Sequence, residues 1–166
     1  MNLEGYLAKI KSYAPYLDLE RIAKAYNFGE KAHTGQLRKD GTPFFNHPTS
    51  VSLILAELEM DEETIISALL HDTVEDTTVT LAEVEKLFGK EVATLVDGVT
   101  KLAVINYETK QERQVENLRK MFLAMSSDIR VIRIKLADRL HNIRTLGALT
   151  EEKQREKAEE TIDIFA

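Results

Sequence analysis

Four side chains able to do acid–base or metal chemistry are crowded into the stretch SALLHDTVEDT, residues 67–77. His71 and Asp72 are adjacent, and Glu75 and Asp76 follow three residues later. Three carboxylates so close together repel one another unless a positive group offsets their charge. A bound cation is an economical explanation, because imidazole nitrogen and carboxylate oxygen are both common metal ligands.

A metal ion held by His71 and Asp72 needs further ligands from elsewhere in the chain. Neighbouring helical side chains point about 100° apart, so this pair reaches one ion only at or beside the end of a helix. The candidates are His47, with an extended backbone before Pro48, and Asp138, a carboxylate amid the apolar stripe of a helix, where burial alone is costly. Two histidines and two aspartates suit Mn²⁺ or Fe²⁺, with Zn²⁺ as an alternative.

Each of these residues also has an ordinary structural explanation. A histidine in an apolar helix is usually a buried core residue, which is the simpler interpretation of His33 and His141. A lone helical aspartate usually caps a helix or faces solvent, and an acidic pair after a helix is usually exposed. These explanations treat residues singly and do not account for the four candidate ligands as a set. From spacing alone, both interpretations stay open.

Positive side chains occur where a phosphate ligand would need them. Arg38 and Lys39 lie in TGQLRKDGTPFFNH, residues 34–47, whose Gly, Asp-Gly and Pro content predicts a loop. Such a pair suits phosphate binding and, for arginine, stacking on a base. The simpler alternatives are a solvated loop here and a surface position for Lys135. One face of a later helix carries polar residues at three- and four-residue steps, namely Lys135, Asp138, Asn142 and Thr145.

Helices must position these residues, because apolar residues recur at three- and four-residue spacing along most of the chain. Asp18, Asp61 and Asp128 stand at expected N-caps, and Thr80 with Glu83 has capping-box spacing. The segment 101–109 is expected to be a loop. We expect helices at about 3–14, 19–33, 48–58, 62–70, 81–88, 90–99 and 110–125, from 129 onward, and within the charged stretch 150–166.

No alternating pattern, repeat or linker interrupts this helical sequence. We therefore expect an all-α fold in a single domain, residues 1–166, with its core at about 18–149. The helix over 110–125 has its apolar face at Val115, Leu118, Phe122 and Met125. The helix after Asp128 is expected to bury a stripe made of Ile129, Ile132, Leu136, Leu140 and Ile143.

Composition narrows the functional classes. The 166 residues are 43% hydrophobic, as in an ordinary globular domain, and include no cysteine, which excludes disulfides and thiolate metal sites. With 22 basic and 28 acidic residues the net charge is −6, which disfavours nucleic-acid binding. No apolar run approaches the roughly 18 residues of a membrane span, and no signal-peptide stretch begins the chain. We expect a cytoplasmic protein without a membrane partner; the sequence specifies no oligomeric state.

Four ordered motifs carry a resemblance to a known family. HTGQLRKDGTPFFNHP at 33–48, LLHDTVEDT at 69–77, FGKEVATLVDGVTKL at 88–102 and DIRVIRIKLADRLHNIRTL at 128–146 resemble the hydrolase domain of the guanosine tetraphosphate (ppGpp) synthetase/hydrolase family. That domain belongs to the HD phosphohydrolase superfamily of helical bundles. A bare His-Asp pair is weak support, whereas four ordered motifs are specific. The resemblance implies an N-terminal part of a longer protein.

The resemblance also implies a role for each matching residue. The metal, one Mn²⁺ ion, would be held by His47, His71, Asp72 and Asp138. The catalytic carboxylates would be Glu75 and Asp76. The guanine-nucleotide substrate would lie against Arg38, Lys39, Asn142 and Thr145. The implied reaction is hydrolysis of the 3′-pyrophosphate of ppGpp or its pentaphosphate relative, giving GDP or GTP and pyrophosphate.

The chain departs from the family pattern at two places, and two alternative functions stay open. Phe44 and Phe45 stand where a tyrosine and an aliphatic residue are frequent. Asp40 replaces a small polar residue, and its negative charge is expected to weaken phosphate binding. The alternatives are hydrolysis of another nucleotide and a regulatory domain that binds nucleotide without hydrolysing it. The intact acidic pair argues against the regulatory domain.

Overall fold

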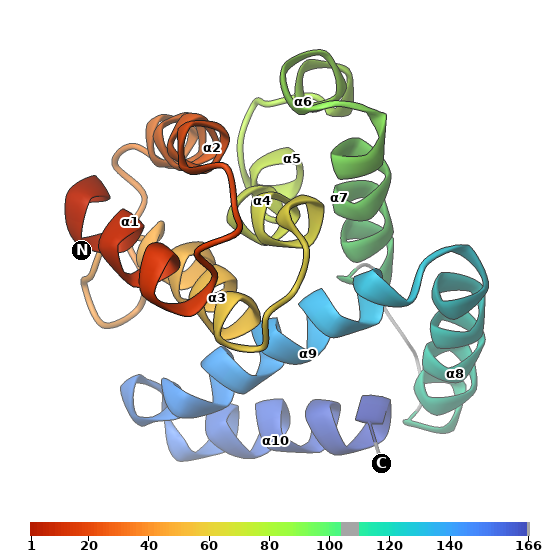
Figure 1. The fold of residues 1–166 in the computed structure, drawn as a ribbon. Helices are drawn as coiled ribbons and strands as arrows, with labels where there is room; N and C mark the ends of the chain where they lie inside the picture. The colour runs from red at the N-terminus through yellow and green to blue at the C-terminus, as the bar shows by residue number, and fades with distance from the viewer. Residues whose placement is uncertain (104–109, 166) are drawn as a thin grey trace.

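Helices make up the described part of the protein, a computed structural model that covers residues 1–103 and 110–165 (Figure 1). Within those residues no strand forms, and Leu37 and Pro43 make one isolated β-bridge. The predicted all-α class is therefore confirmed. In chain order the elements are α1 (Leu3–Tyr13), α2 (Leu19–Ala32), α3 (Asn46–Glu57), α4 (Glu62–Leu70), α5 (Thr73–Asp76), α6 (Leu81–Phe88), α7 (Lys90–Ala103), α8 (Lys110–Ser127), α9 (Ile129–Arg144), a short 3₁₀ helix (Leu146–Ala148) and α10 (Glu151–Phe165).

Side-chain caps explain where several helices begin. The carboxylate of Asp18 accepts hydrogen bonds from two backbone N–H groups of α2, and that of Asp128 accepts one from α9. Thr80 and Glu83 form the predicted capping box at the start of α6. Asp61 stands at the N-cap of α4, but its carboxylate accepts from the Thr64 hydroxyl instead of a backbone N–H. Gly89 ends α6 with φ of 98°.

Two helix boundaries and one short helix differ from the sequence prediction. The helix α3 begins at Asn46, so His47 lies in its first turn and is not extended, as we had expected from the following proline. Pro48 fits there because the first turn of a helix leaves its N–H groups without intrahelical partners. The helix α7 continues to Ala103, so 101–103 are helical and not a loop; the rest of that predicted loop, 104–109, lies outside the described residues. The short helix α5 was not predicted.

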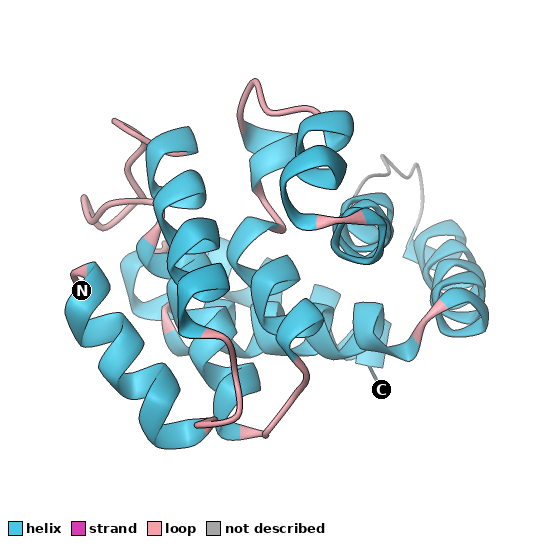
Figure 2. Cartoon of the chain, turned by 45° about the horizontal axis from the view of Figure 1, so that its top comes forward, coloured by secondary structure: helices cyan, strands magenta, loops and turns pink. Residues whose placement is uncertain are grey.

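The core is organised around α4, which lies at the centre of the molecule (Figure 1). It packs against α2, α3, α7 and α9, and each of its residues from Thr64 to Leu70 is buried. A helix buried on every side carries apolar residues all round, which explains the run at 65–70. Figure 2 shows the same helices from a second direction, with loops confined to their ends. Tyr6 and Ile10 of α1 are also fully buried, so the core extends before residue 18. None of the described helices is long and apolar enough to cross a membrane.

The predicted apolar stripe of α9 was wrong for most of its residues. Ile132 is buried, but Leu136 is 43% exposed and Ile129, Leu140 and Ile143 are likewise exposed. The buried face instead carries Val131, Ile134, Lys135, Ala137 and Asp138. This helix has apolar residues on two faces, and the face with the charged residues is the one that packs on α3, α4 and α7. On α8, Val115, Leu118 and Phe122 are exposed, while Met125 lies outside the described side chains.

Two arginines fix the start of α4. The Arg21 guanidinium pairs with Glu62 at 2.6 Å and with Glu63, and it also donates to the Phe88 carbonyl. The Arg130 guanidinium lies 2.6 Å from both Asp61 and Glu91, and so connects the start of α9 to the starts of α4 and α7. These contacts hold the N-terminal end of the central helix. The His-Asp pair follows directly after its C-terminal end.

Candidate metal centre and adjoining cavity

His71 and Asp72 follow directly after α4, as the chain turns into α5. The His71 ring is buried, and its Nδ1 lies 2.6 Å from the Ala68 carbonyl, to which it donates. This contact directs Nε2 toward two carboxylates, with Asp72 Oδ2 at 3.2 Å and Asp138 Oδ1 at 3.5 Å. The end of a helix thus presents one imidazole nitrogen and one carboxylate to the same point, as the adjacent spacing predicted.

His47 and Asp138 reach this point from α3 and α9. The His47 Nε2 atom lies 2.7 Å from Asp138 Oδ1 and 3.9 Å from Asp72 Oδ2. Both residues are buried, at 4% and 6% exposure. The other carboxylate oxygen of Asp138 accepts from Lys135 Nζ at 3.3 Å. Three distant segments of the chain therefore bring together the adjacent His71–Asp72 pair, His47 and Asp138.

The donor atoms of this cluster fit a divalent cation. One ligand atom each from His47, His71 and Asp138 lies within 4.8 Å of the others, and Asp72 approaches both rings from one side. The His71 Nε2 atom is buried yet forms no well-aligned hydrogen bond with any residue that the structure describes. Buried polar atoms normally have a partner, so an imidazole nitrogen in this state suits metal ligation. Nitrogen and oxygen donors without sulfur suit Mn²⁺, Fe²⁺ or Zn²⁺.

The cluster carries an internal balance of charge. Burial alone would lower the pKa of His71, but Asp72 and Asp138 outweigh it and raise that pKa well above its usual value. Burial would raise the pKa of Asp138, yet the hydrogen bond from His47 and the close approach of His71 hold it well below its usual value. The pKa of Asp72 is lowered because the charge of His71 overcomes burial. A protonated His71 imidazole between the two carboxylates therefore offsets their negative charge, as a bound cation would.

Glu75 and Asp76 lie on α5 at the surface of a cavity beside this cluster. Both side chains are exposed, as predicted for an acidic pair after a helix. The backbone carbonyl of Asp76 accepts a hydrogen bond of 2.9 Å from Gln36 Nε2, which joins α5 to the loop over 34–45. Partial burial raises the pKa of each carboxyl, and nearby carboxylates raise it further: Asp76 and Asp72 for Glu75, and Asp72 for Asp76.

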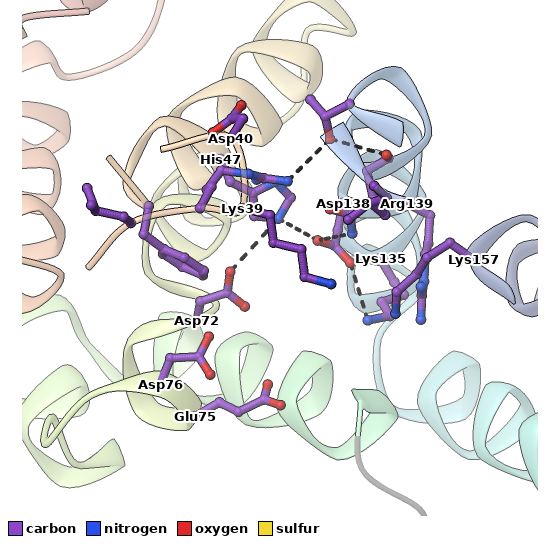
Figure 3. A pocket seen from close by; sticks show the side chains of 16 residues that line it. Lys39, Asp40, His47, Asp72, Glu75, Asp76, Lys135, Asp138, Arg139 and Lys157 are labelled. Atoms are coloured by element: carbon purple, nitrogen blue, oxygen red, sulfur yellow. Dashed lines mark hydrogen bonds and ion pairs between the residues drawn. The ribbon is translucent and has the colours of Figure 1, made fainter. Parts of the chain in front are cut away.

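The cavity has a volume of about 490 Å³, within the range of small-molecule sites. Figure 3 shows two sides of opposite charge. The acidic side consists of Asp72, Asp76 and Glu75. The basic side consists of Lys135, Arg139 and Lys157, and Lys39 extends between the two. The remaining lining residues are Leu37, Arg38, Asp40, Phe44, His47, Asp138, Asn142, Thr145 and Leu149.

The four predicted substrate residues all line this cavity. Arg38 Nη2 donates to the Thr145 hydroxyl at 3.2 Å, so the loop contacts the C-terminal end of α9. Asn142 Nδ2 lies 3.4 Å from Asp138 Oδ1, one helical turn from the metal-ligand candidate. Lys39 is exposed and extends into the cavity.

The structure gives Asp40 a local role. Its carboxylate accepts from the Thr42 backbone N–H at 2.9 Å and from the Thr42 hydroxyl at 2.6 Å. These two bonds close the turn around Gly41, whose φ of 81° favours glycine. They lower the pKa of Asp40 below its usual value. The weaker phosphate binding expected from this residue stays a prediction.

Three residues of the site escaped the sequence prediction, and a fourth, Lys135, had been placed on the polar face of its helix with a surface position left open. Lys135 is 7% exposed and not a surface lysine, and Arg139 lies beside it on the same face of α9. Lys135 lies three residues before Asp138 and four before Arg139, which was a usable signal because positions three and four apart share a helix face. Lys157 comes from α10, in the charged stretch where we predicted a helix but no residue of the site. Its position depends on how α10 packs against α9, which no local pattern encodes.

His141 is the third missed residue. We had expected a core histidine, but His141 is only half-buried, and its Nδ1 lies 2.6 Å from His47 Nδ1. Burial lowers the pKa of His141 to about 4, with smaller contributions from the neighbouring His47 and Arg38. His33, by contrast, is buried, as expected.

Known proteins share both the sequence and the fold. Residues 25–166 match the family described as HD domain. The chain is 53% identical over 166 residues to the GTP pyrophosphokinase of Myxococcus xanthus, covering 98% of this chain and 22% of that protein. It is 50% identical over 157 residues to the bifunctional (p)ppGpp synthase/hydrolase SpoT of Escherichia coli strain K12, covering 95% and 22%.

A solved structure described as "A metazoan ortholog of SpoT hydrolyzes ppGpp and plays a role in starvation responses" superposes with a TM-score of 0.71. It is 32% identical in sequence and covers 90% of this chain and 85% of that chain. The present chain thus spans 22% of the length of the two curated relatives but most of the solved one.

Proposed function

The chain belongs to the HD domain family and, within it, to the SpoT-related (p)ppGpp synthetase/hydrolase proteins, and from this premise we propose that it hydrolyses the 3′-pyrophosphate of ppGpp or its pentaphosphate relative. The products are GDP or GTP and pyrophosphate, and the cofactor is one Mn²⁺ ion. The observation that carries the proposal is a single cavity that joins a buried His/Asp cluster to an acidic side and a basic side. The solved relative, which matches this fold over 85% of its own chain, is described as hydrolysing ppGpp.

In this proposal His47, His71, Asp72 and Asp138 hold the metal. When bound, a divalent cation supplies positive charge that acidifies water and neutralises phosphate oxygens. Because His71 must lose its proton to become a ligand, the two aspartates that stabilise that proton are also the groups that favour a cation in its place.

The acidic pair acts on the attacking water. Glu75 and Asp76 lie on the cavity surface next to Asp72, within the same short segment as the ligand pair. A general base must lie near the proton that it removes, and its pKa is most useful when it is raised toward the working pH. Both carboxyls have raised pKa values, which supports their assignment as the groups that orient water and accept its proton.

The basic side and the loop bind the nucleotide. Lys135, Arg139 and Lys157 face the acidic side across the cavity, where they can pair with phosphate oxygens. Arg38 is half-buried at the cavity edge, and its planar guanidinium suits stacking on a purine base. Asn142 and Thr145 supply an amide and a hydroxyl on the adjoining face of α9. The basic side thus neutralises phosphate charge, while the acidic side acts on the water that attacks the scissile phosphate.

The test is release of pyrophosphate from ppGpp by the purified chain with Mn²⁺. We expect His71→Ala and Asp72→Ala to abolish turnover, and Glu75→Ala to lower the rate about 10²–10⁴-fold while Mn²⁺ still binds. Glu85→Ala, an exposed carboxylate on α6, is the matched control and should leave the rate unchanged. A wild-type chain that binds Mn²⁺ and ppGpp without forming pyrophosphate would contradict the proposal and favour a regulatory domain. Faster turnover of another nucleotide in a competition assay would change the substrate.

Two further expectations accompany this proposal as predictions. The guanine-nucleotide substrate and the lack of cysteine are compatible with a cytoplasmic location. The placement of this domain at the N-terminal part of a longer protein rests on the family resemblance.

A further inference from the structure

His71 and His47 differ in the partner of Nδ1, the ring nitrogen that faces away from the proposed metal position. His71 Nδ1 donates to the backbone carbonyl of Ala68 at 2.6 Å, which fixes the ring without any side chain. His47 Nδ1 instead lies 2.6 Å from His141 Nδ1, and the two rings are 4.9 Å apart at an angle of 35°. The orientation of His47 therefore depends on a second side chain.

The hydrogen on His47 must move when a cation binds. In the metal-free cluster, the short contact of His47 Nε2 with Asp138 Oδ1, at 2.7 Å, is a hydrogen bond in which Nε2 donates. A ligand nitrogen offers a lone pair to the metal, so Nε2 has to give up that hydrogen. A neutral imidazole keeps one hydrogen, which then lies on Nδ1. Nδ1 of His47 faces His141, so an acceptor is needed there.

We propose that His141 is a positioning residue whose Nδ1 accepts this hydrogen and so holds His47 in the tautomer and orientation required of a metal ligand. Partners of this kind are usual for metal-binding histidines, and their loss weakens metal affinity. The inference deepens the proposed function, because it rests on the metal centre assigned above.

The geometry of α9 supports this role. Asp138 and His141 are three residues apart, so one turn of one helix carries both a ligand candidate and the group that orients a second ligand candidate. His141 itself is only half-buried, so the core does not enclose it on every side. Any shift of α9 relative to α3 would change the Nδ1–Nδ1 contact and the Asp138 contact together.

The experiment measures Mn²⁺ affinity of the metal-free chain by calorimetric titration. His141→Phe keeps a ring but offers no acceptor, and we expect affinity to fall about 10–100-fold. His141→Asn places an amide oxygen near the position of Nδ1, and its affinity should stay within about threefold of wild type, well inside the usual loss. Ile143→Ala, an exposed residue of the same helix end, is the matched control.

A second measurement does not depend on any variant. In ¹⁵N-histidine-labelled protein loaded with diamagnetic Zn²⁺, we expect a nitrogen–nitrogen coupling across the hydrogen bond between His47 and His141. Its absence would overturn the inference, as would a folded Phe variant that binds Mn²⁺ as tightly as wild type, or a folded Asn variant as weak as Phe. A wild-type chain that binds no Mn²⁺ would instead contradict the proposed function.

Discussion

Lys135 and Asp138 form a buried charged pair that also lines the cavity, so its role is not only structural. They lie one turn apart on α9, both under 10% exposed, with Nζ 3.3 Å from Oδ2. Removing water from one charge is costly unless the other stays beside it. Asp138 also contacts His47 and His71, so its charge is stabilised by groups other than Lys135. The Lys135 ammonium can therefore also interact with a ligand in the cavity that it lines.

Replacement of this lysine should separate substrate binding from metal binding. Because a hydrogen bond to a charged group contributes about 1.5–3 kcal/mol, Lys135→Met should lower kcat/KM for ppGpp roughly 10–100-fold. Mn²⁺ affinity should be unchanged or higher, since the cluster loses a competing positive charge. Arg133→Met, exposed on the same helix, is the control. Weaker Mn²⁺ binding with unchanged kcat/KM would contradict this assignment.

The acidic pair should lower stability at neutral pH. The folded-state pKa values of Glu75 and Asp76 are raised, so the folded chain holds their protons more tightly than the unfolded chain. Their favourable contribution is present below the unfolded pKa of about 4 and is lost as pH rises through the folded pKa. Without metal, Glu75→Gln should therefore raise Tm at pH 7 by roughly 1–3 °C.

The matched control for that change is Glu85→Gln, which lies on the exposed side of α6. Thermal unfolding from pH 4 to pH 7 checks the sign, because the difference between wild type and Glu75→Gln should shrink toward pH 4. A variant less stable than wild type at pH 7 would show that Glu75 is held by favourable contacts.

At the scale of elements, close helix packing explains how the loop and the cluster meet. Gly29 of α2 lies against the Phe45 ring, and a Cβ built there would come within 2.6 Å of it and 3.3 Å of the Leu69 carbonyl. Phe45 caps α3, which carries His47, and Leu69 precedes the His-Asp pair. The absence of one side chain thus lets α2 approach both segments that supply histidine ligands.

Gly29→Ala should destabilise the fold. Phe45 is buried and Leu69 contributes backbone, so neither neighbour can yield cheaply, and overpacking of this kind costs about 1–3 kcal/mol. Chemical denaturation should show a lower midpoint with an unchanged slope. Gly147→Ala, which meets nothing within 4 Å, should be close to wild type. Equal midpoints for Gly29→Ala and wild type would mean that Phe45 can move aside.

The elements also show what could be predicted from the sequence. Caps and helical spacing predicted α2, α4 and α6 because the signals of these helices are local. The stripe on α9 failed because apolar residues occupy two of its faces, and tertiary packing selected the face with Lys135 and Asp138. Spacing alone left the metal cluster undecided, and the four ordered family motifs were what assigned its residues, because ligands from three distant segments share no local signal. Lys157 was not, since its place depends on α10 docking.

At the scale of the whole molecule, the cluster joins distant parts of the chain. Its side chains come from the first turn of α3, the end of α4 and the middle of α9. A ligand that binds only the folded state raises stability by mass action, by about 2.7 kcal/mol at a hundredfold excess over Kd. The metal site should therefore act as a clamp on three segments.

Mn²⁺ should raise Tm by roughly 5–10 °C at such an excess in a domain of this size. A chelator should reverse the increase, and His71→Ala should show none, whatever its own Tm. Differential scanning calorimetry with and without Mn²⁺ provides the measurement. An equal Mn²⁺-induced increase in His71→Ala would place the responsible ion elsewhere on the chain.

The hydrogen bond from Arg38 to Thr145 spans the cavity between the loop and the end of α9. A guanidinium has five N–H donors, and this bond uses one of them. A nucleotide that stacks on Arg38 or pairs with its other donors can therefore bind while Thr145 still holds the group in place. The bond orders a recognition residue before the substrate arrives, and so reduces the conformational entropy that is lost on binding.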